Sequence, residues 1–365
     1  MSFIFTFTSL FLGCQNSEEE KNIESQLEFV DPTQEGPYQI ATRDEDMINR
    51  HGQELTLQVW YPSSQPDDDI HVYGDFFESE IADGGDVDCS VTYPVVLFSH
   101  GNGGIRYQSY FLAEHLASHG FIVVAPDHVG NTLMDNDDSR KPELITRRPQ
   151  DIADAYDWLL EEERFDGCID EDDGYAAIGH SFGGYTVLSL AGAYLDTDAT
   201  LDICENFGGW LCSHVAQIAE EQGAGTYNNS DSRIWATVPM TPAGVSTLYP
   251  NLENINVPTL VWAGDKDDLT TVDEVVRPIY DALPADKKYW ANIIDAGHYS
   301  FSNACDWLNT YPDCGEGFLS PLDVHQIVKT TTTAFLQKER GMDGMNDYLP
   351  PSDQRVLWEE GVVEN

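Results

Sequence analysis

Basic residues are scarce in this sequence. The 365 residues include 18 Lys and Arg against 64 Asp and Glu, so the formal net charge is −46 at pH 7. Such a surface repels the phosphate backbones of nucleic acids and the headgroups of anionic lipids. We therefore expect no nucleic-acid partner, and we interpret the carboxylates as a solvated surface that favours solubility.

The apolar segment at the N-terminus is too short to span a membrane. Residues 1–13 (MSFIFTFTSLFLG) carry no charge and are followed by Cys14 and a polar run. This arrangement resembles a bacterial lipoprotein signal, in which the cysteine is lipidated and becomes the mature N-terminus. An ordinary signal peptide and a buried first strand are the alternatives. We expect an exported protein, either anchored to a membrane through Cys14 or secreted.

The sequence has no CxxC pair and no His/Cys cluster, so we expect no metal and no cofactor. Acidic clusters at 83–88 and 170–174 resemble fragments of calcium loops, but neither completes the EF-hand spacing. Six cysteines remain besides Cys14, and an even number in an exported protein suggests disulfides, with 15 possible pairings. Two pairs are close enough in sequence to close local loops and leave a third: Cys204 with Cys212, Cys305 with Cys314, and Cys89 with Cys168.

Short apolar runs alternate with helical patterns along most of the chain. This alternation predicts an α/β protein with a mostly parallel central sheet and helices on both faces. The predicted strands are 54–61, 94–98, 121–126, 175–178, 233–238, 259–263 and 289–294, and the predicted helices are 107–119, 152–160, 182–194, 272–283 and 324–338.

We see no internal repeat and no linker that divides this run, so we predict one domain over 51–340. A signal segment at 1–14 and a polar entry at 15–50 precede it, and a tail at 341–365 follows. A polar insertion at about 196–232 interrupts the pattern. It is either a small cap over the site or a surface loop.

Residues 179–183 (GHSFG) carry the strongest motif. A serine hydroxyl is a poor nucleophile near neutral pH and needs both a base and a turn that exposes it. The pattern follows the apolar strand 175–178 and opens a helix, which is the setting of a nucleophile elbow. Its glycines let strand and helix pass closely. We therefore predict that Ser181 is a nucleophile.

The base and the acid follow the nucleophile in folds with such an elbow, and three histidines follow Ser181. His214 lies in the insertion, and His325 opens the last predicted helix, where we expect a surface or first-turn residue. His298 lies in the loop 295–301 (DAGHYSF) directly after a predicted strand, and the glycine before it lets the loop bend toward the elbow. His298 is the predicted base.

The acid is expected in the loop 264–268 (GDKDD), which offers three carboxylates. A buried acid orients the imidazole and stabilises its protonated form. In related loops the aspartate most often lies three residues after the glycine, which selects Asp267. Asp265 and Asp268 remain possible, and their alternative role is to cap the following helix.

The transition state also needs donors for a developing oxyanion. The backbone N–H of Phe182, directly after the nucleophile, is one predicted donor. The Gly-rich loop 99–104 (SHGNGG) supplies the other, and the main-chain N–H of Asn102 is our choice. We interpret His100 and His180 as structural residues that brace this loop and the elbow.

These motifs resemble a known family. Residues 95–104 (VVLFSHGNGG), 116–127 (LASHGFIVVAPD) and 179–184 (GHSFGG) are similar to platelet-activating-factor acetylhydrolases and to bacterial proteins called predicted dienelactone hydrolases, as are the His298 loop and 147–151 (RRPQD). Polyester-cleaving cutinase-like enzymes are more distant relatives. The resemblance covers roughly 50–340, without the insertion. Dienelactone hydrolase itself uses a cysteine nucleophile, so that label says little about the substrate here.

The resemblance implies an α/β-hydrolase fold and a metal-free carboxylic ester hydrolase that acts on lipophilic or short acyl esters. An acyltransferase or peptidase on the same triad, or an inactive binding protein of this fold, are the alternatives. We expect a monomer whose partner is a small-molecule or lipid ester. Trp210, Tyr227 and Trp235 are candidates for an acyl pocket, but the segments that shape the pocket, 63–90 and 196–232, are the least informative.

Overall fold

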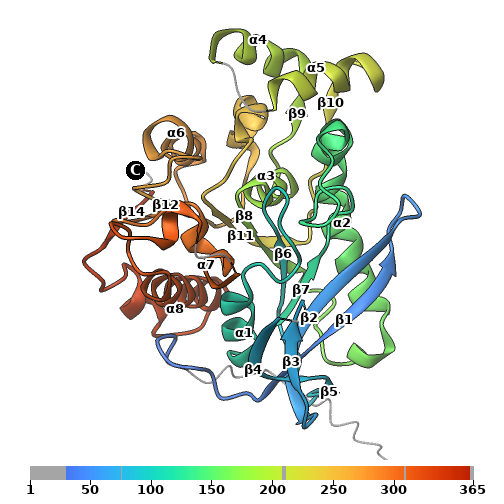
Figure 1. Cartoon of the computed structure of the whole chain (residues 1–365), viewed down its shortest axis with the longest axis vertical. Coiled ribbons are helices and arrows are strands. Elements are labelled where there is room, and N and C mark those ends of the chain that lie inside the picture. Colours follow the sequence, from blue (N-terminus) through green and yellow to red (C-terminus); the bar gives the residue numbers. More distant parts are fainter. Residues whose placement is uncertain (1–29, 75, 208–210, 308–309, 362–365) are drawn as a thin grey trace, which may run out of the picture.

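The computed structural model describes residues 30–74, 76–207, 211–307 and 310–361. Twelve strands of this part form one sheet in the order β14-β13-β12-β11-β8-β6-β7-β2-β1-β4-β3, with β5 paired to β2 (Figure 1). The six central strands are parallel and run as β13 (Lys288–Ile293), β12 (Thr259–Gly264), β11 (Ile234–Met240), β8 (Tyr175–His180), β6 (Val95–Ser99) and β7 (Ile122–Pro126).

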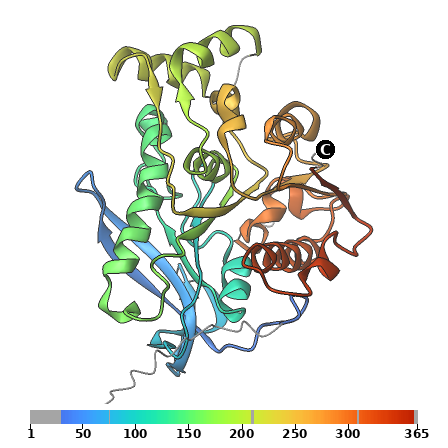
Figure 2. The same ribbon diagram turned by 180° about the vertical axis from the view of Figure 1, so that it is seen from behind.

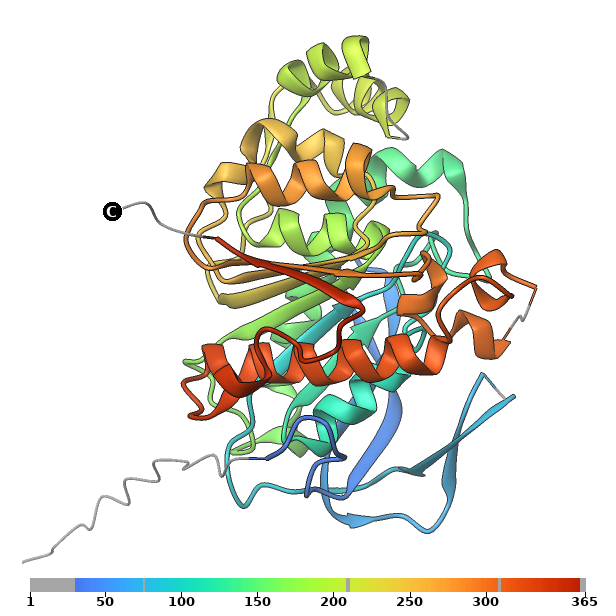
Figure 3. The same cartoon turned by 90° about the vertical axis from the view of Figure 1, so that its left-hand side faces the viewer.

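Helices cover both faces of this sheet, as the alternation predicted. Figure 3 shows the sheet edge-on, with α1 and α8 on one face and α2, α3 and α6 on the other. Because both faces are covered, the central strands are almost wholly buried and apolar. The helices are α1 (Tyr110–Ser118), α2 (Lys141–Glu161), α3 (Phe182–Leu190), α6 (Arg277–Ala282), which follows the short helix η4 (Val272–Val276), and α8 (Pro321–Glu339).

Helix α2 begins much earlier than the predicted segment 152–160. It starts at Lys141, and its first half buries Leu144, Ile145 and Arg148. Pro149 lies inside the helix. A proline usually marks a helix boundary, because it lacks an N–H and disfavours the helical conformation of the residue before it. That signal, together with a buried arginine, hides the first half of α2 from sequence reasoning.

Antiparallel strands extend the sheet at both ends. Figure 2 shows the β1–β2 hairpin projecting at one edge and the C-terminal part of the chain at the other. The polar stretch 63–90 contains three short strands that the sequence analysis did not predict. The strands at these ends are β1 (Ile40–Ile48), β2 (Glu54–Pro66), β3 (Ile70–Tyr73), β4 (Phe77–Asp83), β5 (Gly85–Val87) and β14 (Val356–Glu360), which pairs with β13.

The insertion forms an outer layer over the side of the sheet that α2 and α3 cover, seen at the top of Figure 1. Its helix α4 packs against the 3₁₀ segment η3, and its helix α5 packs against α2. Apolar side chains of the insertion, Leu211, Val215 and Ile218, join the core beside α2 and α3. Its elements are β9 (Leu195–Asp196), α4 (Thr197–Phe207), α5 (Cys212–Glu221) and β10 (Thr226–Tyr227), and η3 spans Val245–Asn254.

Three disulfides join the described cysteines in the pairing that the sequence suggested. Cys89 bonds Cys168, Cys204 bonds Cys212 and Cys305 bonds Cys314. Disulfides of this kind are typical of exported proteins. Cys14 and the apolar segment before it lie outside the described residues. Among the helices that are described, none combines the length and the apolar composition needed to cross a membrane.

Candidate active site

The serine of the GHSFG motif lies at the sharp turn between β8 and α3. Ser181 has φ = 55° and ψ = −116°, a conformation that non-glycine residues rarely adopt. A Cβ atom on Gly179 would clash with the Gly183 carbonyl, and one on Gly183 would clash with the Ser99 carbonyl. The glycines are therefore required by the close passage of strand, helix and neighbouring loop. The geometry is that of the predicted nucleophile elbow.

The predicted base and acid contact each other at the same edge of the sheet. His298 follows β13, Asp267 follows β12, and His298 Nδ1 lies 2.8 Å from Asp267 Oδ2. Both side chains are buried. Thr270 Oγ1 donates to the same Asp267 oxygen at 2.6 Å, and the backbone N–H groups of Leu269 and Thr270 donate to the other oxygen. The carboxylate is therefore held rigidly against the imidazole.

Burial acts to raise the pKa of Asp267, but the hydrogen bonds from His298 and Thr270 and the charge of His298 outweigh it. The pKa of Asp267 is therefore lowered from its ordinary value. An ionised acid beside Nδ1 favours the tautomer that leaves Nε2 free to accept a proton. Asp265 and Asp268, the two alternatives, are exposed. Of the three aspartates, Asp267 is the one that contacts His298 within the described residues.

The elbow and the histidine loop are linked through His180. Its Nε2 lies 2.9 Å from the His298 carbonyl oxygen, and the two rings are 4.8 Å apart. The Ser181 backbone N–H donates to the Met240 carbonyl at 2.9 Å, which ties the elbow to β11. Within the described part of the chain, the Ser181 hydroxyl makes no hydrogen bond to His298. Such bonds are often long without substrate and tighten only in the complex.

The loop after β6 lies directly against the elbow. Ser99 pairs with Gly179 across the two strands, and a Cβ on Gly101 would lie 3.3 Å from that of Ser181. Asn102 is exposed, and its side-chain oxygen accepts from Asn131 Nδ2 at 2.8 Å. Its backbone N–H has no partner among the described residues. Phe182 opens α3 directly after the serine, and Asn102 follows Gly101, which lies against it.

The remaining histidines of this region have structural contacts. His100 Nδ1 lies 2.7 Å from the Gly101 carbonyl, and His180 Nδ1 lies 3.0 Å from Gln108 Nε2. Burial, aided by the charge of His298, lowers the pKa of His180 to about 3, so this ring is neutral. His325 is buried and stacks on Phe111 at 3.7 Å, so the expectation of a surface residue is wrong. Helix α8, which carries His325, begins earlier than predicted, and His325 lies on its buried face.

Three residues that sequence reasoning missed support the site. Thr270 bonds Asp267, and the Gln108 side chain accepts from the Gly101 N–H at 2.9 Å. Asp313 Oδ2 accepts the N–H of Tyr299, next to the catalytic histidine candidate, at 2.5 Å. None of these residues belongs to a motif, although Gln108 and Asp313 lie only 7 and 14 residues from the groups they contact. No signal in a single sequence identifies them.

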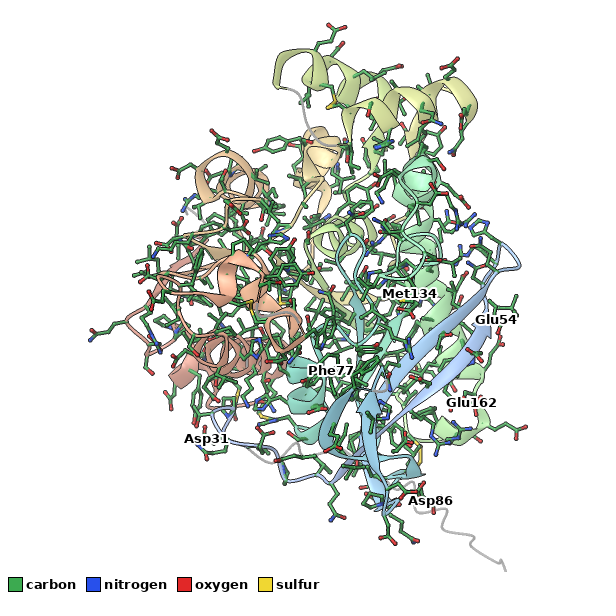
Figure 4. All side chains as sticks on the ribbon, viewed as in Figure 1. Asp31, Glu54, Phe77, Asp86, Met134 and Glu162 are labelled. Atoms are coloured by element: carbon green, nitrogen blue, oxygen red, sulfur yellow. A yellow bond between two sulfur atoms is a disulfide. The ribbon has the colours of Figure 1, made fainter. Side chains whose placement is uncertain are left out.

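Exposed apolar side chains border these loops. Leu133 and Met134 are 58% and 84% exposed in the loop next to Asn102 (Figure 4), and Leu269, 56% exposed, follows the acid loop. The proposed pocket residues lie elsewhere or are not described. Tyr227 belongs to β10 in the insertion, the Trp235 ring lies 5.7 Å from the Arg340 guanidinium, and Trp210 lies outside the described residues.

A cleft of about 580 Å³ lies away from these loops. Its lining includes Arg43, Asp67, Asp86 and Arg164, and it contains none of the candidate catalytic residues. Groups of three or more His, Cys, Asp or Glu side chains that could hold a metal ion are absent from the described residues.

Comparison with known proteins agrees with this geometry. A family model described as chlorophyllase matches residues 88–205, and one described as PET hydrolase-like matches residues 218–312. Cutinase 2 of Thermobifida cellulosilytica is 28% identical over 210 residues, which are 57% of this chain and 62% of that protein. Cutinase cut1 of Thermobifida fusca is also 28% identical, over 57% of this chain and 50% of its own length. Platelet-activating factor acetylhydrolase of Cavia porcellus is 29% identical over 140 residues, 26% of this chain and 31% of that protein.

The elbow, the sheet and these matches define the class of the protein: the chain has the α/β-hydrolase fold, as predicted. Within that class it is similar to the cutinase-like and platelet-activating-factor acetylhydrolase group, which the sequence motifs also indicated. The chain spans between half and about three-fifths of the length of the two cutinases named above.

Proposed function

We propose that the protein is a carboxylic ester hydrolase that works through an acyl-enzyme on Ser181. The observation that carries the proposal is the buried hydrogen bond between His298 and Asp267, at the sheet edge where the elbow holds Ser181. An oriented imidazole beside a strained serine is the arrangement that activates a hydroxyl.

In the proposed reaction, His298 Nε2 removes the Ser181 proton as the oxygen attacks the ester carbonyl. The N–H groups of Asn102 and Phe182 stabilise the oxyanion. The C–O bond of the ester then breaks, and the alcohol leaves with the proton from His298. Water attacks the acyl-serine by the same route, which releases the acid and restores the serine.

We propose lipophilic or short-chain acyl esters as substrates. The relatives named as cutinases and as a platelet-activating factor acetylhydrolase support this range, and so does the apolar border formed by Leu133, Met134 and Leu269. We also propose that the protein acts outside the cytoplasm, secreted or anchored through a lipidated Cys14. The three disulfides support export.

Ser181→Ala tests the proposal directly. The variant should lose nearly all esterase activity, on the order of a million-fold in kcat if the triad acts as a unit. Hydrolysis of p-nitrophenyl esters of increasing chain length measures the loss, and a fluorophosphonate probe should label the wild type but not the variant. Residual activity above a few per cent would exclude Ser181 as the nucleophile.

The three aspartates of the acid loop give a matched set. Asp267→Asn should lower kcat by about ten-thousand-fold, because the amide favours the wrong tautomer of His298. Asp265→Asn and Asp268→Asn remove the same charge at exposed positions, and an amide oxygen at position 265 can still accept the Asp295 N–H, as Asp265 does. Both should leave kcat within about twofold. A large loss in either exposed variant with little loss in Asp267→Asn would contradict the assignment.

A further inference from the structure

Arg148, in the middle of α2, is fully buried and lies behind the elbow. Its guanidinium donates to four oxygens: Thr186 Oγ1 at 3.2 Å, Asn131 Oδ1 at 2.5 Å, Ser99 Oγ at 3.0 Å and the carbonyl of His100. All four acceptors are uncharged groups, and no ion pair joins Arg148 to a carboxylate among the described residues. Burial of a cation is costly. The charge of Asp151 offsets part of this cost, but its carboxylate bonds to Asn49 and His128 and not to Arg148.

Two of these contacts determine the position of the Asn102 loop. The His100 carbonyl lies two residues before Asn102 in the chain. Asn131 accepts from Arg148 through Oδ1 and donates through Nδ2 to Asn102 Oδ1 at 2.8 Å. A chain of two hydrogen bonds therefore links the buried guanidinium to the residue that carries one predicted oxyanion donor.

Two further contacts of Arg148, to Thr186 and Phe182, reach the helix that carries the second predicted donor. Thr186 lies in the second turn of α3, and the guanidinium of Arg148 stacks on the Phe182 ring at 4.6 Å. The planar fork of arginine can serve several oxygens at once in a fixed geometry, which a lysine ammonium cannot. One side chain thus braces the segments before Asn102 and after Ser181 against each other.

A buried pair, His128 with Asp151, supports the same loop. His128 lies between Asp151 and Ser99, with Nδ1 3.0 Å from Asp151 Oδ2 and Nε2 3.0 Å from Ser99 Oγ. His128 also donates its backbone N–H to His100 Nε2 at 3.1 Å. Ser99 is therefore held from two sides, by Arg148 and by His128.

We infer that Arg148 is a positioning residue for the oxyanion hole, acting on Asn102 through Asn131 and on Phe182 through the elbow helix. Oxyanion stabilisation depends on donors that are already oriented before the charge develops, so a small displacement of the loop lowers kcat more than it changes substrate binding. This inference rests on the proposed function, because it assigns a role within the same ester hydrolysis.

The link through Asn131 gives the sharpest test. Asn131→Ala breaks the chain at its middle, and Asn102→Ala removes the tether but keeps the main-chain N–H. Each should lower kcat for a short p-nitrophenyl ester by about 10- to 100-fold, with KM within about threefold. The double variant should lose no more than the larger single loss, because both changes remove one connection. The shape of the pH profile of kcat should not change.

Arg148→Lys should lower kcat at least as much as Asn131→Ala does. Arg233→Lys is the matched control for Arg148→Lys. Arg233 pairs with Asp231 and stacks on Tyr156 away from the elbow, so its change should affect melting temperature but not kcat. Additive losses in the double variant, or lower melting temperature with unchanged kcat in Asn131→Ala and Arg148→Lys, would overturn the inference. An inactive wild type that resists the fluorophosphonate would instead refute the proposed function.

Discussion

Individual residues at this site depend on backbone geometry as much as on their side-chain chemistry. Ser181 carries a common hydroxyl, and the nucleophilic role that we propose for it depends on the positive φ that turns it out of the strand. Asp267 differs from Asp265 and Asp268 only in burial and contacts. Three carboxylates that look equivalent in the sequence therefore have different surroundings in the folded chain.

Glu114 shows the same effect away from the site. Its side chain accepts from the Tyr73 hydroxyl at 2.9 Å and from Ser79 Oγ at 2.7 Å, between α1 and the β3–β4 hairpin. Burial is the main cause that raises the pKa of Glu114 to about 7, and the hydrogen bonds oppose it. A carboxyl group with a raised pKa binds its proton more tightly in the folded state than in the unfolded state.

The sign of the resulting pH dependence follows from linkage. Below the ordinary glutamate pKa both states are protonated, and the folded protein keeps the full contribution of Glu114. That contribution is lost as the pH rises toward 7, because the unfolded state is already ionised. Glu114→Gln keeps the acceptor oxygen and removes the titration. We expect it to raise the free energy of unfolding at pH 8 by about 1 to 2 kcal/mol and to have little effect near pH 4.5.

Urea unfolding at both pH values measures this difference. Glu78→Gln on the neighbouring strand β4, where the side chain is exposed, is the control for the loss of one negative charge. A gain that is equal at pH 4.5 and pH 8 would contradict the role of Glu114.

Among the elements, the loops at the carboxyl ends of the parallel strands carry the proposed catalytic residues, and one disulfide supports them. Cys305–Cys314 closes the segment that carries Asp313. The Asp313 carboxylate accepts the Tyr299 N–H, and a Cβ on Gly297 would collide with it, so the segment packs tightly on the His298 loop. Cys204–Cys212 closes a loop of similar length in the insertion.

These two disulfides make a matched pair for an experiment. Replacing either pair with serines should lower the free energy of unfolding by about 2 to 3 kcal/mol, because both close short loops. Only Cys305→Ser/Cys314→Ser should also lower kcat, by about tenfold or more, because it frees the His298 loop; a change in the insertion, which we expect to shape the substrate pocket, should act on KM. Calorimetry and ester hydrolysis below the transition measure both effects. Equal kcat in the two double variants would show that the Cys305–Cys314 segment does not position His298.

For the whole molecule, the dominant physical feature is the excess of carboxylates. A formal charge of −46 destabilises the compact state through self-repulsion and keeps copies of the protein apart. Salt shortens the range of this repulsion from about 10 Å at 0.1 M to about 3 Å at 1 M.

We therefore expect the melting temperature at pH 8 to rise by several degrees between 10 mM and 1 M NaCl. Near pH 4.1, where the net charge of the chain is close to zero, the same salt series should have a much smaller effect. Differential scanning fluorimetry of the wild type at both pH values measures the change in melting temperature with salt. A salt effect of equal size at the two pH values would show that charge repulsion is not its cause.

Much of the fold followed from patterns that are local in sequence. The apolar runs that became β6, β7, β8, β11, β12 and β13 are continuous, because both faces of a parallel sheet are covered. The first half of α2 and the strands of 63–90 were missed. A proline and polar residues conceal their burial, which depends on distant partners.

By itself, the sequence determined the elbow at Ser181 and the loop that carries His298, because glycine spacing and strand ends are local signals. The tertiary structure decided which of three aspartates contacts that histidine, and it brought Arg148, Asn131 and Asn102 into one chain of hydrogen bonds. The physical reason is that burial and hydrogen-bond partners are properties of the folded chain. A buried arginine has no periodicity that marks it, and its acceptors lie on three different segments.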